Sequence, residues 1–480
     1  MKSKSEILDD PRAPNFYACI QCGACTSICP AAHAFYVDKE FSEEYNPRRI
    51  IQELILNKGV GVNGYPIDKC FHCYSCKSVC IKKNSVSDIV KILRESNDTE
   101  SEYKDLLYKS FYEKGLSVTL STYSDGFDDW IGFEDIIKDM GRIRSDIGLE
   151  AVHRAIPSES LHEIRKIADL TKNKKFIKTK ELGRPKKTIP EDKLYLFKSC
   201  IMDAHYPGVT PSIKYIFDRL DVDYLDDPNQ STCTGFPYYA DAVPFSTMLA
   251  INARNFAKAE ESGYTNISPV CVTSYGVLTE AKEILESGVR GEVNEVLHEV
   301  GLHLKGDINV SHISETFYRL KSRIKEMIEF DCDGLKVATH SGCHYTKMFK
   351  ESAIPNLLDE LISVTCTKPV YYTEKNLCCG MGFKHALENR DLSRSVATRK
   401  LRSIKDSGAD IVIYSCPGCQ VTLDRNQRYI EEKTGEEFDF VHMNYAELIA
   451  ILMGADPYKT VGIQAHSIPV EPILERLKIL

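Results

Sequence analysis

Apolar and polar residues follow two different patterns along this chain. In the N-terminal part, apolar residues recur every three or four positions over residues 50–56, 90–93 and 136–140, which predicts amphipathic helices. The first of these runs follows Pro47, and proline is favoured in the first turn of a helix. We therefore expect helices and their connections over the first 170 residues.

From about residue 194, short apolar runs alternate with helical patterns. Residues 194–197, 335–338 and 411–414 predict strands, and residues 212–220 predict a helix. Each predicted strand is followed closely by a turn that contains cysteine. This alternation predicts α/β layers with parallel strands, in which ligand sites gather beyond the carboxyl ends of the strands.

The composition is that of a globular protein. The chain has 480 residues, of which 43% are hydrophobic and 27% charged, and its formal net charge is −8. These values exclude a disordered, collagen-like or coiled-coil chain, and they give no reason to expect nucleic acid as a partner. Neither a signal-peptide pattern nor an uninterrupted run of ~18 apolar residues occurs. We expect no direct membrane span and a cytoplasmic location, with peripheral attachment to the inner face of a membrane only through a partner.

A basic stretch precedes the first predicted strand. Eight lysine and arginine residues occur over residues 172–187. A solvated linker and a docking strap for an acidic partner are both compatible with this stretch.

The 18 cysteines are clustered, which favours metal binding over disulfides in a chain without an export signal. Two runs share the spacing C-x2-C-x2-C-x3-C. The first run is Cys19, Cys22, Cys25 and Cys29, and the second is Cys70, Cys73, Cys76 and Cys80. In two-cluster ferredoxins, the fourth cysteine of each run binds the other cluster.

This rule predicts two [4Fe-4S] cubanes with exchanged fourth ligands. One cluster would be bound by Cys19, Cys22, Cys25 and Cys80, and the other by Cys70, Cys73, Cys76 and Cys29. Zinc also accepts four thiolates, but two complete runs of this spacing favour iron–sulfur clusters. The helical pattern between the runs predicts a helical module rather than a compact β-rich ferredoxin.

The C-terminal part contains an internal repeat. The second copy has Cys343, then Cys378-Cys379-Gly380, then Cys416-Pro417-Gly418-Cys419. The first copy, 143 to 145 residues earlier, has Cys200, then Cys233-Thr234-Gly235, then Cys271 and Ser274. Thr234 and Ser274 therefore occupy the positions of Cys379 and Cys419. We expect two half-domains related by duplication, with a boundary near residue 330.

Five thiolates in the second copy are one more than a cubane or a zinc ion binds. They predict a larger or unusual cluster, with a zinc site plus one free thiol as the alternative. Gly380 is expected to allow a close approach of the backbone to the cluster or to a substrate. Cys332 and Cys366 fit neither copy and are expected to be small hydrophobic residues.

These motifs resemble a known enzyme family, heterodisulfide reductase. The second copy matches the CCG domain of its B-type subunit, and residues 17–23 resemble its C-type subunit. Over residues 15–100 and 194–475 the chain resembles a fusion of the C-type and B-type subunits, as in the D-type subunit of the membrane-linked enzyme. The resemblance implies a noncubane [4Fe-4S] cluster on five cysteines, namely Cys343, Cys378, Cys379, Cys416 and Cys419.

The expected architecture follows from the residue patterns together with the family resemblance. The fold class is α/β plus a helical two-cluster ferredoxin module, with C-terminal duplicated CCG α/β half-domains. The expected domains are a tail (1–14), the ferredoxin-like module (15–100), a helical connector with a basic linker (101–193), a degenerate CCG half-domain (194–330) and a complete one (331–480).

The first copy departs from the family pattern. Its three cysteines, Cys200, Cys233 and Cys271, cannot form a five-sulfur cage. They are remnants, ligands of a further [4Fe-4S] cluster, or ligands of zinc together with His205 or water. The family cleaves a disulfide between two complete sites, whereas this chain has one.

Residues near the cluster loops are candidates for catalysis. His340, His344 and His385 are candidate proton donors, provided that a pKa lies near neutrality, and Lys384 could attract an anionic substrate. Structural or solvated roles are the alternative for each. No Gly-rich nucleotide motif occurs, so electrons are expected from a flavoprotein subunit or a membrane b-type cytochrome.

Two functions remain open at this point. The first is the iron–sulfur subunit of a heterodisulfide reductase-like complex, which reduces or forms a sulfur–sulfur bond of a small thiol or a carrier protein. The second is an electron-transfer subunit of a flavin-dependent 2-hydroxyacid or glycerol-3-phosphate dehydrogenase complex.

Overall fold

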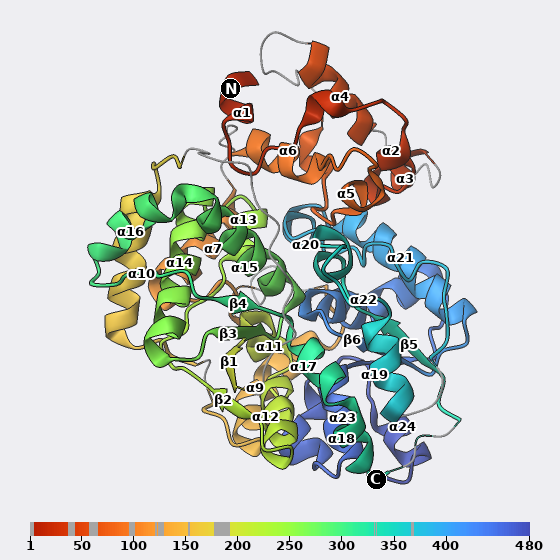
Figure 1. The fold of residues 1–480 in the computed structure, drawn as a ribbon. Coiled ribbons are helices and arrows are strands. Elements are labelled where there is room, and N and C mark those ends of the chain that lie inside the picture. Colours follow the sequence, from red (N-terminus) through yellow and green to blue (C-terminus); the bar gives the residue numbers. More distant parts are fainter. Residues whose placement is uncertain are drawn as a thin grey trace.

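The computed structural model describes residues 4–36, 44–56, 66–95, 101–120, 122, 129–151, 154–176, 193–330, 332, 334–365 and 369–480. Most of the basic stretch, residues 177–192, and Cys366 lie outside the described residues. Figure 1 shows a helical N-terminal module above two α/β halves that lie side by side.

The N-terminal module is helical where it is described. Its helices are α1 (Lys4–Leu8), α2 (Ala24–Ser27), α3 (Pro30–Tyr36), α4 (Pro47–Leu56), α5 (Ser75–Val79) and α6 (Val86–Arg94). Helix α4 begins at Pro47 as predicted, and the hydroxyl of Ser85 caps α6 by accepting the Asp88 amide. No strand occurs among the described residues of this module, which agrees with the helical prediction.

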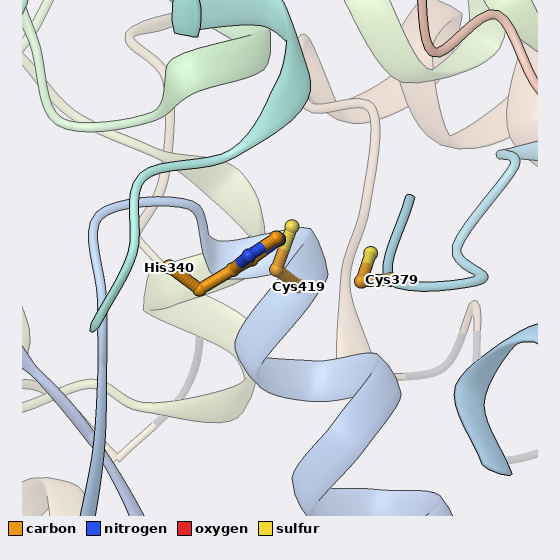
Figure 2. A group of neighbouring side chains, drawn as sticks. All are labelled: His340, Cys379 and Cys419. Carbon is orange, nitrogen blue, oxygen red and sulfur yellow. The ribbon is translucent and has the colours of Figure 1, made fainter. Parts of the chain in front are cut away.

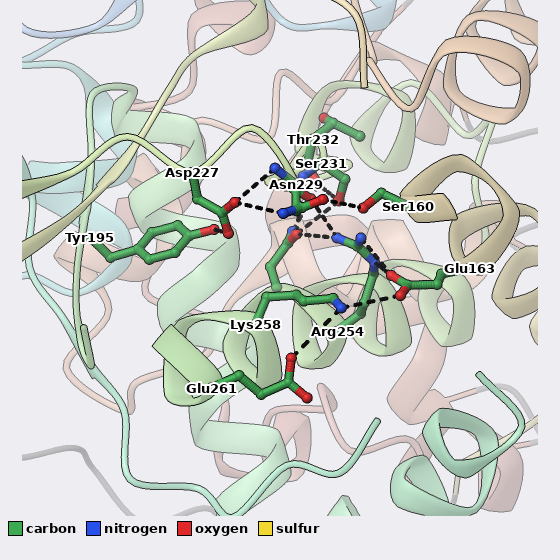
Figure 3. A network of polar contacts seen from close by, with 11 residues as sticks. Ser160, Glu163, Tyr195, Asp227, Asn229, Ser231, Thr232, Arg254, Lys258 and Glu261 are labelled. Atoms are coloured by element: carbon green, nitrogen blue, oxygen red, sulfur yellow. Dashed lines mark hydrogen bonds and ion pairs between the residues drawn. The ribbon is translucent and has the colours of Figure 1, made fainter. Parts of the chain in front are cut away.

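In the described part of the connector between the module and the sheets lie α7 (Glu102–Lys114), α9 (Phe133–Asp146) and α10 (Ser158–Thr171). Helix α9 contains the predicted helical segment 136–140. Helix α10 packs on α14 (Phe245–Ser262), where the Arg254 guanidinium bonds the Glu163 carboxylate at 2.8 Å (Figure 3). Lys258 also pairs with Glu163, at 3.2 Å. This buried polar network joins the connector to the first copy of the repeat.

The first copy forms a parallel sheet with strand order β2-β1-β3-β4. The strands are β1 (Lys193–Phe197), β2 (Asp223–Leu225), β3 (Asn266–Pro269) and β4 (Asn309–Val310). Its remaining helices are α11 (Cys200–His205), α12 (Val209–Arg219), α13 (Gly235–Tyr239), α15 (Val272–Ile284) and α16 (Arg290–His298). The predicted helix at 212–220 thus begins three residues earlier, at Val209.

The second copy forms a separate parallel sheet, β5-β6-β7. The strands are β5 (Val337–His340), β6 (Ile411–Tyr414) and β7 (Val441–Asn444). The helices of this region are α17 (Ile313–Arg319), α18 (Lys321–Glu326), α19 (Leu357–Thr365), α20 (Lys384–Glu388), α21 (Arg390–Asp406), α22 (Pro417–Thr434), α23 (Tyr445–Leu452) and α24 (Glu471–Arg476). Strand β5 starts two residues later than predicted, because the Leu335 amide closes a turn onto the Cys332 carbonyl.

The α/β prediction with parallel strands is confirmed. Strands β3 and β6 begin 145 residues apart, which is the period of the cysteine repeat. Cys332 is fully buried, as expected for a small hydrophobic residue, and it is disulfide-bonded. Among the helices that the structure describes, none combines the length and the apolar character needed to cross a membrane.

Candidate functional site

The first cysteine run surrounds a pocket of about 420 Å³ at the surface of the N-terminal module. Cys19, Cys22 and Cys25 line it together with Cys80, the last cysteine of the second run. Cys76 also reaches the same pocket. Gly23, with a φ of +84°, precedes α2 and turns the chain sharply between Cys22 and Cys25. The Cys22 side chain is exposed.

The first three cysteines of the second run are buried, and Cys29 lies beside them. Burial raises the pKa of the Cys29 thiol well above its ordinary value, and the neighbouring Cys73, Cys70 and Cys76 raise it further. The fourth cysteine of each run therefore lies among the first three of the other run.

The five cysteines of the second copy line one cavity. Cys343 follows β5, Cys416 follows β6 and Cys419 lies in the first turn of α22. The Cys378–Cys379 pair comes from the loop before α20. Figure 2 shows Cys379 and Cys419 with His340, and the ligand atoms of these three residues lie within 4.8 Å of one another.

Negative charge is concentrated on one of these thiols. Hydrogen bonds from Cys378 and Cys419 lower the pKa of Cys379 well below its ordinary value, while those same bonds raise the pKa of the two donors. Five thiols around one cavity match the ligand chemistry of an iron–sulfur centre, since iron would supply the positive charge that burial otherwise denies to thiolates.

The second run and the second copy meet directly. Cys73 and Cys378 pack in one cluster of buried residues, and the interaction with Cys378 is the largest cause lowering the pKa of Cys73 to about 5. The two cysteine sets are thus in contact at the boundary between the N-terminal module and the second copy.

The three cysteines of the first copy also gather. Burial is the main cause raising the pKa of Cys200 to about 12, and Cys233 adds to it; Cys271 lies near Cys416, Cys233 and Cys200. The hydroxyl of Ser274, at the position of Cys419, donates to the sulfur of Cys233 at 3.1 Å.

His205, the candidate additional zinc ligand in the first copy, is also buried. Its ring stacks on Phe133 with 5.6 Å between the ring centroids.

Comparison with known proteins assigns this chain to a family. A model described as "Cysteine-rich domain" (CCG) matches residues 194–278 and 337–424, and a "4Fe-4S dicluster domain" model matches residues 15–84. The B-type subunit of a ferredoxin:CoB-CoM heterodisulfide reductase from Methanosarcina acetivorans is 40% identical over 309 residues, which are 61% of this chain and 98% of that protein. The chain belongs to the family of B-type heterodisulfide reductase subunits.

Other relatives match further parts of this heterodisulfide reductase homologue. The C-type subunit of a heterodisulfide reductase from the same organism is 32% identical over 152 residues, which are 29% of this chain and 57% of that protein. "Lactate utilization protein A" of Bacillus pumilus is 23% identical over 232 residues, which are 48% of this chain and 90% of that protein. The resemblance to the C-type and B-type subunits noted in the sequence is therefore confirmed, and the chain is an iron–sulfur protein.

The candidate catalytic histidines of this family member are buried. Burial is the largest cause lowering the pKa of His340 to about 4, of His344 to about 4 and of His385 to about 3. The Nδ1 atom of His340 lies 3.2 Å from the Tyr372 hydroxyl, and Nε2 of His344 donates to the His72 carbonyl at 2.9 Å. At neutral pH these rings are uncharged, in contrast to the near-neutral pKa considered from the sequence.

The candidate anion-binding lysine already has a partner. Lys384 pairs with Glu388 at 3.3 Å within α20. Two other lysines, which sequence reasoning missed, lie near the cysteines. Lys347 is 7% exposed, and its positive charge favours the thiolate forms of Cys73 and Cys343. Lys400 is 1% exposed and interacts electrostatically with Cys379. Lys347 lies about one helical turn after Cys343, so its position in the sequence could have indicated that it lies near the cysteines. No such spacing in the sequence indicated Lys400.

Gly380 has a structural role that the sequence did not predict. Its φ is +100°, and a Cβ atom there would clash with the Ser393 carbonyl oxygen and lie 3.1 Å from the Ala397 amide nitrogen. Glycine is therefore needed where the loop packs against the backbone of α21.

Proposed function

We propose that this chain is the iron–sulfur subunit of a heterodisulfide reductase-like complex, in which electrons pass through two cubanes to a noncubane cluster that reduces or forms a sulfur–sulfur bond. The observation that carries the proposal is the direct contact between Cys73 and Cys378. It joins the buried cysteine run to the five-thiol cavity without intervening protein.

The proposed ligand sets follow the grouping of the cysteines. Cys19, Cys22, Cys25 and Cys80 would hold the outer cubane, and Cys70, Cys73, Cys76 and Cys29 the inner one. Cys343, Cys378, Cys379, Cys416 and Cys419 would hold the noncubane cluster. When bound, that cluster would supply an open iron and single electrons.

The reaction must be balanced in electrons and protons. Reducing a disulfide breaks the S–S bond, takes up two electrons and two protons, and yields two thiols. The electrons would arrive singly through the cubanes. His340, uncharged at neutral pH, hydrogen-bonds Cys379 and would hold that sulfur in position, while the two protons would be taken up from water.

Electrons would enter at the first cysteine run, which would hold the outer cubane. The Cys22 side chain is exposed there, whereas Cys70, Cys73 and Cys76 are buried. Arg48 and Lys82 line the same pocket, and none of its described lining residues is acidic. A flavoprotein subunit or a membrane b-type cytochrome remains the proposed donor, and the latter would hold this chain at the inner face of a membrane.

We propose that the first copy is a remnant without its own cluster. The Ser274 hydroxyl stands where the second copy has Cys419, and it hydrogen-bonds the Cys233 thiol instead of adding a ligand. Catalysis would then rest on one complete site.

Electron paramagnetic resonance tests the proposed function. Anaerobically purified protein is oxidised with and without added thiol. A spin-½ signal that appears only with thiol supports sulfur chemistry at the second copy. Normal signals from reduced cubanes without any thiol-dependent signal would contradict it.

That second outcome would favour the alternative, an electron-transfer subunit of a flavin-dependent 2-hydroxyacid or glycerol-3-phosphate dehydrogenase complex. The similarity to lactate utilization protein A supports this alternative. Co-purification with a flavoprotein that oxidises a hydroxyacid in the absence of any thiol would establish it.

A further inference from the structure

One buried carboxyl group, that of Glu280 on α15, has no part in the proposed reaction. Glu280 is 9% exposed, and its Oε2 atom makes no hydrogen bond within the described part of the chain. Gly276 lies one helical turn earlier, where an added Cβ atom would be 3.0 Å from Nδ1 of His344 and from the sulfur of Met348. Residues four apart share one face of a helix, so Glu280 lies on the side of α15 that packs against η4 (His344–Met348).

Buried phenols connect this carboxyl group to the N-terminal module. The Tyr239 hydroxyl lies 3.9 Å from the sulfur of Met348 and 3.3 Å from the Tyr74 hydroxyl. Both phenols interact electrostatically with Glu280. Tyr74 directly follows Cys73, a proposed ligand of the inner cubane, so the phenols lie between Glu280 and that site.

Other ionisable groups face Glu280 from the segment after α1 and from α5, α6, α13 and α15: they are Arg12, Lys77, Asp88, Tyr238 and Glu283. Burial is the largest influence and, with the charge of Asp88, it raises the pKa of Glu280 to about 8. Arg12 acts in the opposite direction, but its guanidinium is already paired with Asp10 at 2.6 Å. At neutral pH, Glu280 is therefore mostly a neutral carboxylic acid.

We propose that Glu280 is a proton-binding site coupled to the redox state of the inner cubane. Reduction brings one electron from the external donor and adds negative charge near Tyr74, which favours the protonated carboxyl group; the proton comes from solvent water. The coupling is reciprocal, so ionisation of Glu280 lowers the reduction potential. The inference rests on the proposed ligand set of the inner cubane, but not on the thiol chemistry of the second copy.

Redox titration of the intact protein between about pH 6.5 and about pH 10, followed by electron paramagnetic resonance, tests the proposal. We expect reduction to raise the proton affinity of Glu280 about tenfold, which corresponds to a fall of about 59 mV in the potential of the inner cubane as the pH rises. Glu280→Gln cannot ionise and should keep the potential at the acidic limit of the wild type. Glu286→Gln, an exposed residue just after α15, is the matched control and should keep the wild-type profile.

A wild-type fall in potential that persists in Glu280→Gln would overturn the proposal. Asp88→Asn gives a second test at a partly buried position. It removes a charge that opposes the ionisation of Glu280, so the fall should keep its amplitude and move to lower pH. An unshifted profile in this variant would mean that another group titrates.

The infrared difference spectrum of reduction checks the same step in the wild type alone. At alkaline pH, the C=O band of a protonated carboxylic acid should appear on reduction, and its absence would overturn the proposal. The thiol-dependent spin-½ signal is measured separately. Its absence beside a normal pH profile would contradict the proposed sulfur chemistry and leave the role of Glu280 intact.

Discussion

The ammonium group of Lys347 donates a hydrogen bond of 2.6 Å to the hydroxyl of Ser75. The same hydroxyl lies 3.3 Å from the sulfur of Cys73, and its hydrogen bond helps to lower the pKa of Cys73. Lys347 lies in segment η4 (His344–Met348), directly after Cys343, so one buried cation stands between the thiols of the N-terminal module and those of the second copy.

Replacing Lys347 by methionine should lower the reduction potentials of the inner cubane and of the noncubane cluster. A nearby positive charge favours the reduced, more negative form, and its removal should cost about 60 mV, or about 1.4 kcal/mol. Redox titration followed by electron paramagnetic resonance measures the shift. Lys350→Met is the matched control, because Lys350 is exposed. Equal shifts in both variants would mean that the buried charge has no special effect.

Asp241 connects the N-terminal module to the first copy. Its carboxylate pairs with Lys91 at 2.8 Å and with Arg94 at 2.5 Å. Asp241→Asn should lower the free energy of unfolding by about 3 kcal/mol, because two buried cations lose their anion. Chemical denaturation measures this loss. Asp221→Asn is the control: both aspartates have a positive φ, which asparagine tolerates, but Asp221 is exposed.

The stability difference between the wild type and the Asp241→Asn variant should also depend on pH. The two cations hold the pKa of Asp241 well below its ordinary value, even though burial alone would raise it. A carboxylate with a depressed pKa stabilises the folded state above its unfolded pKa of about 4, and this contribution is lost as the pH falls through the folded pKa. The stability difference between wild type and Asp241→Asn should therefore be constant near neutral pH and shrink below about pH 4. A constant difference down to pH 3 would show that the ion pairs are not its cause.

Cys379→Ala should abolish the thiol-dependent signal while both cubanes remain reducible. Hydrogen bonds from Cys378 and Cys419 lower the pKa of Cys379 well below its ordinary value. Cys233→Ala, the comparable change in the first copy, should leave the iron and zinc content and the signal unchanged. Loss of metal in the Cys233 variant would instead establish a site in the first copy.

Lys82→Glu should slow reduction by a negatively charged donor. Lys82 is exposed beside Cys22 and Cys80. At low ionic strength we expect reduction of the clusters by dithionite to slow about tenfold, and reduction by the methyl viologen radical cation to become faster. Stopped-flow absorbance measures both rates. Lys459→Glu, an exposed lysine of the second copy, should change neither rate; equal effects of the two variants would place electron uptake elsewhere.

The spacing of residues that are close in sequence predicted many of the helices and strands and the grouping of the cysteines. Helices α4, α6 and α9 follow from apolar residues at helical spacing, and strands β1 and β6 from short continuous apolar runs, because both signals lie in residues that are close in sequence. The two cysteine runs and the repeat were also readable, since a cluster loop is a local structure. The parallel pairing of the strands followed from the alternation of strands and helices.

The tertiary structure decided what surrounds the cysteines. Cys73 and Cys378 are 305 residues apart in sequence, and only packing of the N-terminal module on α21 and η4 brings them together. Likewise, the need for glycine at 380 arises from the α21 backbone, and the wall of the five-cysteine cavity combines Phe71, Phe236 and Phe383 from three segments. The sequence by itself determined which residues bear the sulfur chemistry, because their spacing is local; the charge, access and connection of the sites arise from long-range contacts, which no periodicity records.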